Sequence, residues 1–210
     1  MKLCPWIGPE FKQANDHGLP RRLLLLGESH YGGGKPYDGF TTEVVKDCYI
    51  EQGNLRFFTN MAKVILGPDW PQHTPEHRAS FYNSVAFYNF IQHVFGEIRA
   101  RPTNEMWEYG RAAFIQCLNC VKPSHIVVFS FGVWDELPNE CFSKCPQLED
   151  SLSHHLPARY RNRGGHKRRG WIGQYQHTEG TALVLKVIHA SRCSPTEWHP
   201  VASWFVNLNN

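Results

Sequence analysis

The sequence has no run of 18 consecutive apolar residues, and its mean hydropathy is −0.45. A spanning helix needs about 20 apolar residues, so a membrane-spanning helix is excluded. The first residues lack the apolar stretch of a secretory signal, and we therefore expect a cytoplasmic protein. Internal repeats, low-complexity tracts and a dividing linker are also missing, which predicts a single domain over residues 1–210. Hydrophobic residues make up 41% and aromatic residues 13% of the chain, enough for a sizeable core, so disorder is excluded as its main state.

The chain has seven cysteines, an odd number, and shows no export signal. Both features favour free thiols in a reducing compartment. Two pairs have the short spacing of metal ligands, Cys117 with Cys120 and Cys141 with Cys145. They leave a four-thiolate zinc or iron–sulfur site open. Small buried apolar side chains are the favoured interpretation, so we predict no metal.

Charge is unevenly distributed along the chain. Residues 1–150 sum to −3, whereas residues 151–210 sum to +6. A basic run over 159–169 contains two glycines, which indicates a loop rather than a helix face. Such a loop suits contacts with nucleic-acid phosphates, although a solvated loop without a ligand has the same composition. The basic residues expected to contact DNA are Arg163, Lys167, Arg168 and Arg169.

Four near-continuous apolar runs predict strands that are covered on both faces. They occupy residues 23–26, 85–88, 126–129 and 182–188. Helical patterns lie between them at 54–66 and 107–120, and Thr74-Pro75-Glu76 is typical of a helix start. This alternation predicts an α/β fold with three α/β/α layers and a central, mostly parallel, four-stranded sheet.

Polar residues and glycines follow each predicted strand, where ligands bind in open parallel sheets. Glu28, Ser29 and His30 follow the first, Asn89 the second, Ser130 and Gly132 the third, and His189 the fourth. Each has an ordinary structural interpretation by itself, such as a cap or a buried histidine. Their convergence at one sheet edge predicts an active site.

These residues resemble the motifs of the uracil-DNA glycosylase superfamily. Gly27-Glu28-Ser29-His30-Tyr31 is similar to the first-strand motif G-Q-D-P-Y or G-E-A-P-G, and His189-Ala190-Ser191 is similar to H-P-S. The second strand ends in Asn89 and the third near Gly132, as in that family. The resemblance spans about residues 20–205 and implies that family's fold and base-excising activity.

The sequence also departs from the family pattern. Ser29 stands where many members carry Asp or Asn, and His30 and Ala190 replace prolines. The cysteines do not match the iron–sulfur pattern of the G-E-A-P-G subgroup. We therefore expect a divergent member whose base is uracil or a modified cytosine, such as a hypermodified phage base.

Cleavage of an N-glycosidic bond places positive charge on the sugar and negative charge on the departing base. We expect Glu28 to activate water or stabilise the sugar cation, with Ser29 or His30 as alternative holders of the water. His189 is expected to donate a hydrogen bond to the base. No metal, organic cofactor or Schiff-base lysine is expected, so the product is an abasic site.

The base must leave the duplex to be reached. Asn89 can read a pyrimidine edge, and the resemblance implies this role. Phe40, with Tyr37 as competitor, is the expected stacking ring, and Tyr31 lies where uracil enzymes exclude thymine. The resemblance also places Ser191, Arg192 and Cys193 in a loop that contacts the DNA minor groove. DNA is the expected partner, with repair or phage defence as the role, and no membrane or obligate protein partner is expected.

Two other functions remain open at this point. The order Ser29, Asp135, His189 matches the triad order of α/β-hydrolases, but Tyr31 replaces the second glycine of the G-x-S-x-G elbow. A protein of the same fold that binds DNA or a modified base without cutting it is the other alternative, because the usual acid is replaced by Ser29.

Overall fold

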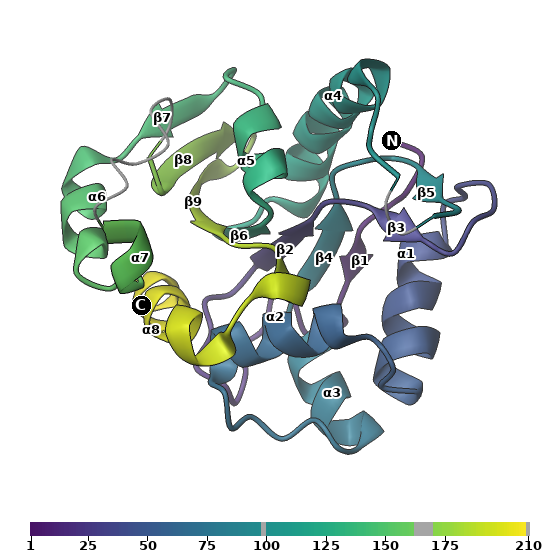
Figure 1. The fold of residues 1–210 in the computed structure, drawn as a ribbon, viewed down its shortest axis with the longest axis horizontal. Helices are drawn as coiled ribbons and strands as arrows, with labels where there is room; N and C mark the ends of the chain where they lie inside the picture. The colour runs from purple at the N-terminus through teal and green to yellow at the C-terminus, as the bar shows by residue number, and fades with distance from the viewer. Residues whose placement is uncertain (98–99, 162–169, 209–210) are drawn as a thin grey trace.

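The computed structural model describes residues 1–97, 100–161 and 170–208. Within these ranges the central sheet has seven strands in the order β1-β4-β2-β6-β9-β8-β7 (Figure 1). The four inner strands run parallel: β4 (Ala86–Asn89), β2 (Leu23–Gly27), β6 (His125–Phe129) and β9 (Gly180–Val187). The four predicted strands and the α/β class with a mostly parallel centre are therefore confirmed.

The prediction of a four-stranded sheet is wrong, because three antiparallel strands extend its edges. They are β1 (Trp6–Ile7) beside β4, β8 (Ile172–His177) beside β9, and β7 (Phe142–Lys144) beside β8. These strands are short or mix apolar with polar residues, so a search for continuous apolar runs does not find them. A separate two-stranded sheet pairs β3 (His30–Tyr31) with β5 (Val94–Phe95).

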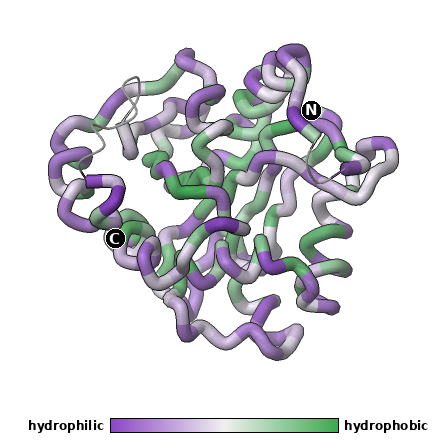
Figure 2. The backbone as a smooth tube through the Cα atoms, in the orientation of Figure 1, coloured by the Kyte–Doolittle hydropathy of each residue, from purple (hydrophilic) through white to green (hydrophobic). Residues whose placement is uncertain are grey.

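Helices cover both faces of the sheet, because successive strand residues point to opposite sides. Leu23 and Leu25 pack into one apolar cluster, and Leu24 and Leu26 pack into a second. The helices whose side chains join the first cluster include η1 (Val44–Glu51), α2 (Arg56–Leu66), α3 (Pro75–Tyr82), α6 (Pro146–Ser153), α7 (Ala158–Arg161) and α8 (Pro195–Val206). The second cluster includes α4 (Asn104–Val121) and α5 (Phe131–Glu136). Hydrophobic segments accordingly run through the centre of the molecule (Figure 2).

The predicted helices are confirmed with small shifts at their ends. The pattern over 54–66 becomes α2, and the pattern over 107–120 becomes α4, which begins three residues earlier. Thr103 caps α4 by accepting a hydrogen bond from the Met106 amide, and Thr74 caps α3 through the His77 amide. In the described part of the chain, no helix combines the length and apolar character needed to cross a membrane.

Strand register brings the carboxyl ends of the parallel strands together. Gly27 pairs with Asn89, Leu26 with Val128, and Phe129 with Val187. The residues that follow these positions therefore meet at one edge of the sheet, as the sequence predicts.

Candidate active site

A carboxylate held by a serine occupies the centre of this edge. Glu28 follows β2, and the hydroxyl of Ser130, which follows β6, donates a hydrogen bond of 2.6 Å to Glu28 Oε2. Ser130 is 3% exposed and is also the N-cap of α5, where its Oγ accepts from the Val133 amide. A Cβ at Gly132 would lie 3.5 Å from Glu28 Oε2, an ordinary van der Waals distance, so this glycine is next to the carboxylate. Ser130 and Gly132 thus both lie next to the same carboxylate oxygen.

His189, which follows β9, presents a neutral ring at the same ends of the parallel strands. Its Nδ1 accepts a hydrogen bond of 3.3 Å from the Ser191 amide and lies 2.8 Å from Ser191 Oγ. Because Nδ1 is the acceptor, the hydrogen of the neutral ring is on Nε2, which is left as a donor. Burial lowers the pKa of His189, the Glu28 carboxylate raises it, and Arg192 lowers it. The charge of Glu28 therefore favours the protonated imidazole, while burial favours the neutral one.

Two buried oxygens at the site have no hydrogen-bond partner in the described part of the chain. They are Asn89 Oδ1 and Ser29 Oγ. Asn89 is 3% exposed, and a Cβ at Gly27 would come within 2.2 Å of its Oδ1, so only glycine fits there. An unpaired buried acceptor is costly, and a bound ligand with an N–H group would satisfy it.

His30 belongs to the wall of the site. It is 4% exposed, burial lowers its pKa to about 4, and its Nε2 lies 3.2 Å from Thr41 Oγ1. The ring of Phe40, the first residue of α1 (Phe40–Glu43), lies 5.1 Å away in an edge-to-face arrangement. His30 is therefore a neutral residue whose ring packs against Phe40 and helps to hold it in place.

The two tyrosines considered at this site are both exposed. Tyr31 is 39% exposed and lies 5.9 Å from the ring of Phe95, on the two-stranded sheet. Tyr37 contacts Phe40 edge-on, and its hydroxyl donates to Glu43. Both rings are at the surface beside the site.

Phe57 was missed by the sequence analysis. It is in the first turn of α2, with its ring 5.2 Å from that of His189 and its Cζ 3.2 Å from a Cβ built on Gly27. The apolar positions that predict this helix do not include 57. An aromatic residue outside the core-facing stripe was the available signal.

The predicted DNA-contacting residues divide into three groups. Ser191 and Arg192 are exposed in the short helix η2 (Ala190–Arg192) beside His189. Cys193 is 5% exposed and packs in the core, and burial raises its pKa to about 12, so its thiol does not face a surface ligand. The remaining four, Arg163, Lys167, Arg168 and Arg169, lie outside the described residues.

The rival arrangements find little geometric support. All seven cysteines are free, and the described residues hold no group of three or more metal-ligating side chains. Ser191 occupies His189 Nδ1, the atom that an aspartate would orient in a Ser-His-Asp triad. Asp135, the expected third member, is exposed on α5.

No protein-family model matches this sequence, and no curated protein matches it.

Proposed function

We propose that the protein is a DNA N-glycosylase that flips out an altered pyrimidine and excises it, with a fold like that of the uracil-DNA glycosylases. One observation carries this proposal. A serine-held carboxylate, Glu28, and a neutral imidazole, His189, whose Nε2–H is available to a ligand, lie at the same ends of the parallel strands, and the charge of Glu28 raises the pKa of His189. A reaction that makes a sugar cation and a base anion needs this pair of groups.

Each group has a defined task in the proposed reaction. Glu28 stabilises the developing charge on the sugar or orients the attacking water, and the hydrogen bond from Ser130 leaves its Oε1 available for that water. His189 donates from Nε2 to the departing base, whose oxygen gains negative charge in the transition state. Asn89 Oδ1 accepts from an N–H on the pyrimidine edge.

The first loop of the site favours a base with a bulky substituent. Gly32, Gly33 and Gly34 all have positive φ, and no atom lies within 4 Å of a Cβ built on Gly32 or Gly34. Tyr31, which precedes these glycines, is itself exposed. A hypermodified cytosine therefore fits the proposal as well as uracil does, and the modified base would place the protein in phage defence rather than repair.

Base release from a panel of DNA substrates tests the proposal. The panel contains uracil, hypoxanthine, hydroxymethylcytosine and glucosylated hydroxymethylcytosine, with heat or alkali revealing abasic sites. We expect release from one substrate, with loss of activity in Glu28→Gln and His189→Ala. The exposed residues Glu140 and His73 supply matched controls, Glu140→Gln and His73→Ala, which should keep full activity.

A second candidate is a binding protein of the same fold without catalysis, favoured by Ser29 at the position of the usual acid. It predicts DNA binding with no release from any substrate. Hydrolysis of a nitrophenyl ester that depends on Ser29 would instead favour the esterase alternative.

A further inference from the structure

A polar groove of about 740 Å³ lies at the amino ends of the parallel strands, whereas the candidate active site lies at their carboxyl ends. It is formed where β2 and β6 begin, with the C-terminal end of α4 and the β8–β9 turn as its walls. Nothing in the proposed glycosylase chemistry uses it. Its volume falls in the range of small-molecule sites, about 300–1,000 Å³.

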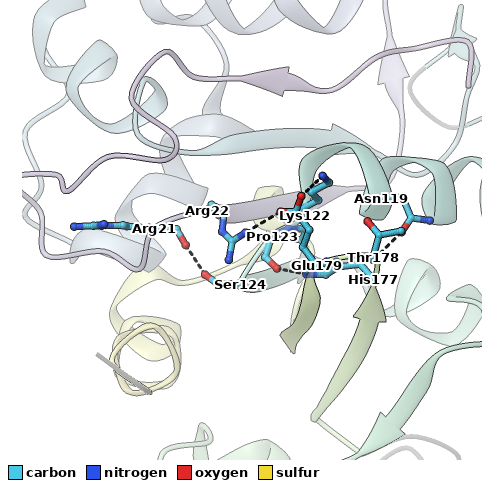
Figure 3. Close-up of polar contacts among 9 residues, drawn as sticks. All are labelled: Arg21, Arg22, Asn119, Lys122, Pro123, Ser124, His177, Thr178 and Glu179. Carbon is cyan, nitrogen blue, oxygen red and sulfur yellow. Dashed lines mark hydrogen bonds and ion pairs between the residues drawn. The ribbon is translucent and has the colours of Figure 1, made fainter.

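The charges in this groove are strongly unbalanced. Lys12, Arg21, Arg22 and Lys122 line it together with a single carboxylate, Glu179. Arg22 and Lys122 both reach Glu179, as Figure 3 shows. The hydrogen bond from Lys122 lowers the pKa of Glu179, and the charges of Lys122, Arg22 and Lys12 add to that effect. One carboxylate thus pairs directly with two of the four cations, Arg22 and Lys122.

Two of the cations have no counter-ion of their own. Among the described residues, the side chains of Lys12 and Arg21 make neither an ion pair nor a hydrogen bond. In Figure 3 the Arg21 guanidinium lies away from Glu179. These two groups are therefore available to an anion from solution.

The backbone of the groove is held in place by hydrogen bonds. The Arg22 amide donates to Phe11 O at 2.9 Å, and the Ser124 amide donates to Arg22 O at 3.0 Å. Arg22 and Lys122 have φ values of 66° and 53°, an uncommon conformation for residues other than glycine. Lys122 adopts it as the C-cap of α4, where the left-handed conformation is common, so the end of the helix fixes the position of this cation.

The β8–β9 turn is held equally firmly. The Glu179 amide donates to His177 Nδ1, so the ring hydrogen is on Nε2, which donates to Pro123 O at 3.0 Å (Figure 3). The Thr178 amide donates to Asn119 Oδ1. Glu179 is therefore positioned at the cations before any ligand arrives.

We propose that this groove binds a small anion with two or more phosphate groups. The excess of three positive charges over Glu179 matches a polyphosphate rather than a carboxylate. The ring of His125 is the single aromatic group among the described lining residues, and it is 4% exposed, so a nucleobase has no surface to stack on. The groove therefore recognises the phosphate chain and not the base.

Calorimetric titration of the full chain with inorganic tripolyphosphate, without divalent metal, tests this proposal. Removal of the two unpartnered cations in Lys12→Gln/Arg21→Gln should weaken binding by about tenfold or more, because both charges that are available to the phosphates are lost. The matched control Lys46→Gln/Arg101→Gln removes two exposed cations remote from the groove and should bind as the wild type does. ATP and GTP should bind equally.

Removing the negative charge of Glu179 gives a second test, in which the expected change in affinity has the opposite sign. Glu179→Gln should tighten tripolyphosphate binding, whereas Glu108→Gln, an exposed carboxylate far along α4, should leave it unchanged. Absence of binding, or equal binding by both cation variants, would overturn the proposal. Competition by a DNA oligonucleotide that also depends on Lys12 and Arg21 would overturn it in favour of a nucleic-acid contact. None of these outcomes depends on glycosylase activity.

Discussion

The orientation of the Glu28 carboxylate depends on a neighbour from another strand. Ser130 is buried, donates to Glu28 and caps α5 with the same hydroxyl. Because it acts on substrate through Glu28, we regard it as a positioning residue.

Replacing this hydroxyl should slow base release without weakening DNA binding. For Ser130→Ala we expect about a tenfold lower single-turnover rate, since a hydrogen bond to a charged group is lost. Loss of the cap should also lower the free energy of unfolding by about 1 kcal/mol. Ser130→Thr, which keeps the hydroxyl, serves as the control. An unchanged rate in a folded Ser130→Ala protein would remove Ser130 from the mechanism.

His30 should make the stability of the fold sensitive to acid. Its pKa is lowered from 6.5 to about 4. Between these pH values His30 is therefore protonated in the unfolded chain but stays neutral in the folded protein. The free energy of unfolding should therefore fall as the pH drops from 6.5 to 4, by up to about 3 kcal/mol from this residue.

Urea denaturation at several pH values measures this effect. His30→Gln should lose less stability over the same interval, and the remaining loss includes that from His125 and His189, whose pKa values are also lowered by burial. An identical pH dependence in the variant would contradict the assignment.

The burial of Lys186 among aromatic rings could not be predicted from the sequence. It is the polar residue in the fourth apolar run, where a strand covered on both faces predicts no lysine. The structure buries it completely, with Nζ 4.6 Å from the centre of the Trp171 ring and 5.2 Å from that of Phe131, and burial lowers its pKa to about 8. The aromatic groups come from distant segments, so spacing along the chain could not reveal them.

At the scale of elements, Arg78 joins α3 to the end of η1. It is 5% exposed and donates three hydrogen bonds of 2.7–2.9 Å to the carbonyls of Ile50, Glu51 and Gln72. Carbonyls at a helix end have no partner within the helix, so this guanidinium satisfies them. The buried cation itself is stabilised by three carbonyl dipoles.

Arg78→Lys should therefore destabilise the protein despite its conserved charge. A lysine cannot make the same three bonds, and we expect a loss of roughly 2–4 kcal/mol in the free energy of unfolding. Guanidinium denaturation measures it, and Arg56→Lys on the exposed face of α2 is the control. Equal stability of the two variants would show that the Arg78 hydrogen bonds contribute little.

The elements that the sequence predicted share one property, which is a strong local pattern. The continuous apolar residues of β2, β4, β6 and β9, and the periodicity of α2 and α4, follow from burial alone. The strand β8 mixes Gly and Gln with apolar residues, and it is stabilised by pairing with β9, a non-local interaction. The pairing of Glu28 with Ser130 likewise depends on register between strands 102 positions apart in sequence.

At the scale of the whole molecule, the parallel strands lie between the candidate active site at their carboxyl ends and the cationic groove at their amino ends. The carboxyl edge holds the carboxylate and imidazole of the proposed reaction, and the amino edge holds the cationic groove. The convergence of motifs at the first edge was predictable, because parallel strands end together. The groove was not, since its cations come from separate segments of the predominantly acidic part of the chain.

The positive charge of residues 151–210 should make DNA affinity fall steeply with salt. We expect log affinity to decline linearly with log salt concentration, and Arg192→Gln to reduce the slope by about 0.9 if Arg192 contacts one phosphate. Binding curves at several salt concentrations measure the slope, with Arg101→Gln as the control. An unchanged slope would place Arg192 outside the DNA interface.

The most direct test of the central claim is chemical identification of what leaves the DNA. Substrate duplex carrying the candidate base is incubated with wild type, and the small-molecule fraction is analysed by mass spectrometry while the strand is examined before and after alkali. We predict a free base, an intact strand that breaks only after alkali, and neither product with Glu28→Gln. Bound DNA with no free base, or a base released equally by Glu28→Gln, would contradict the account.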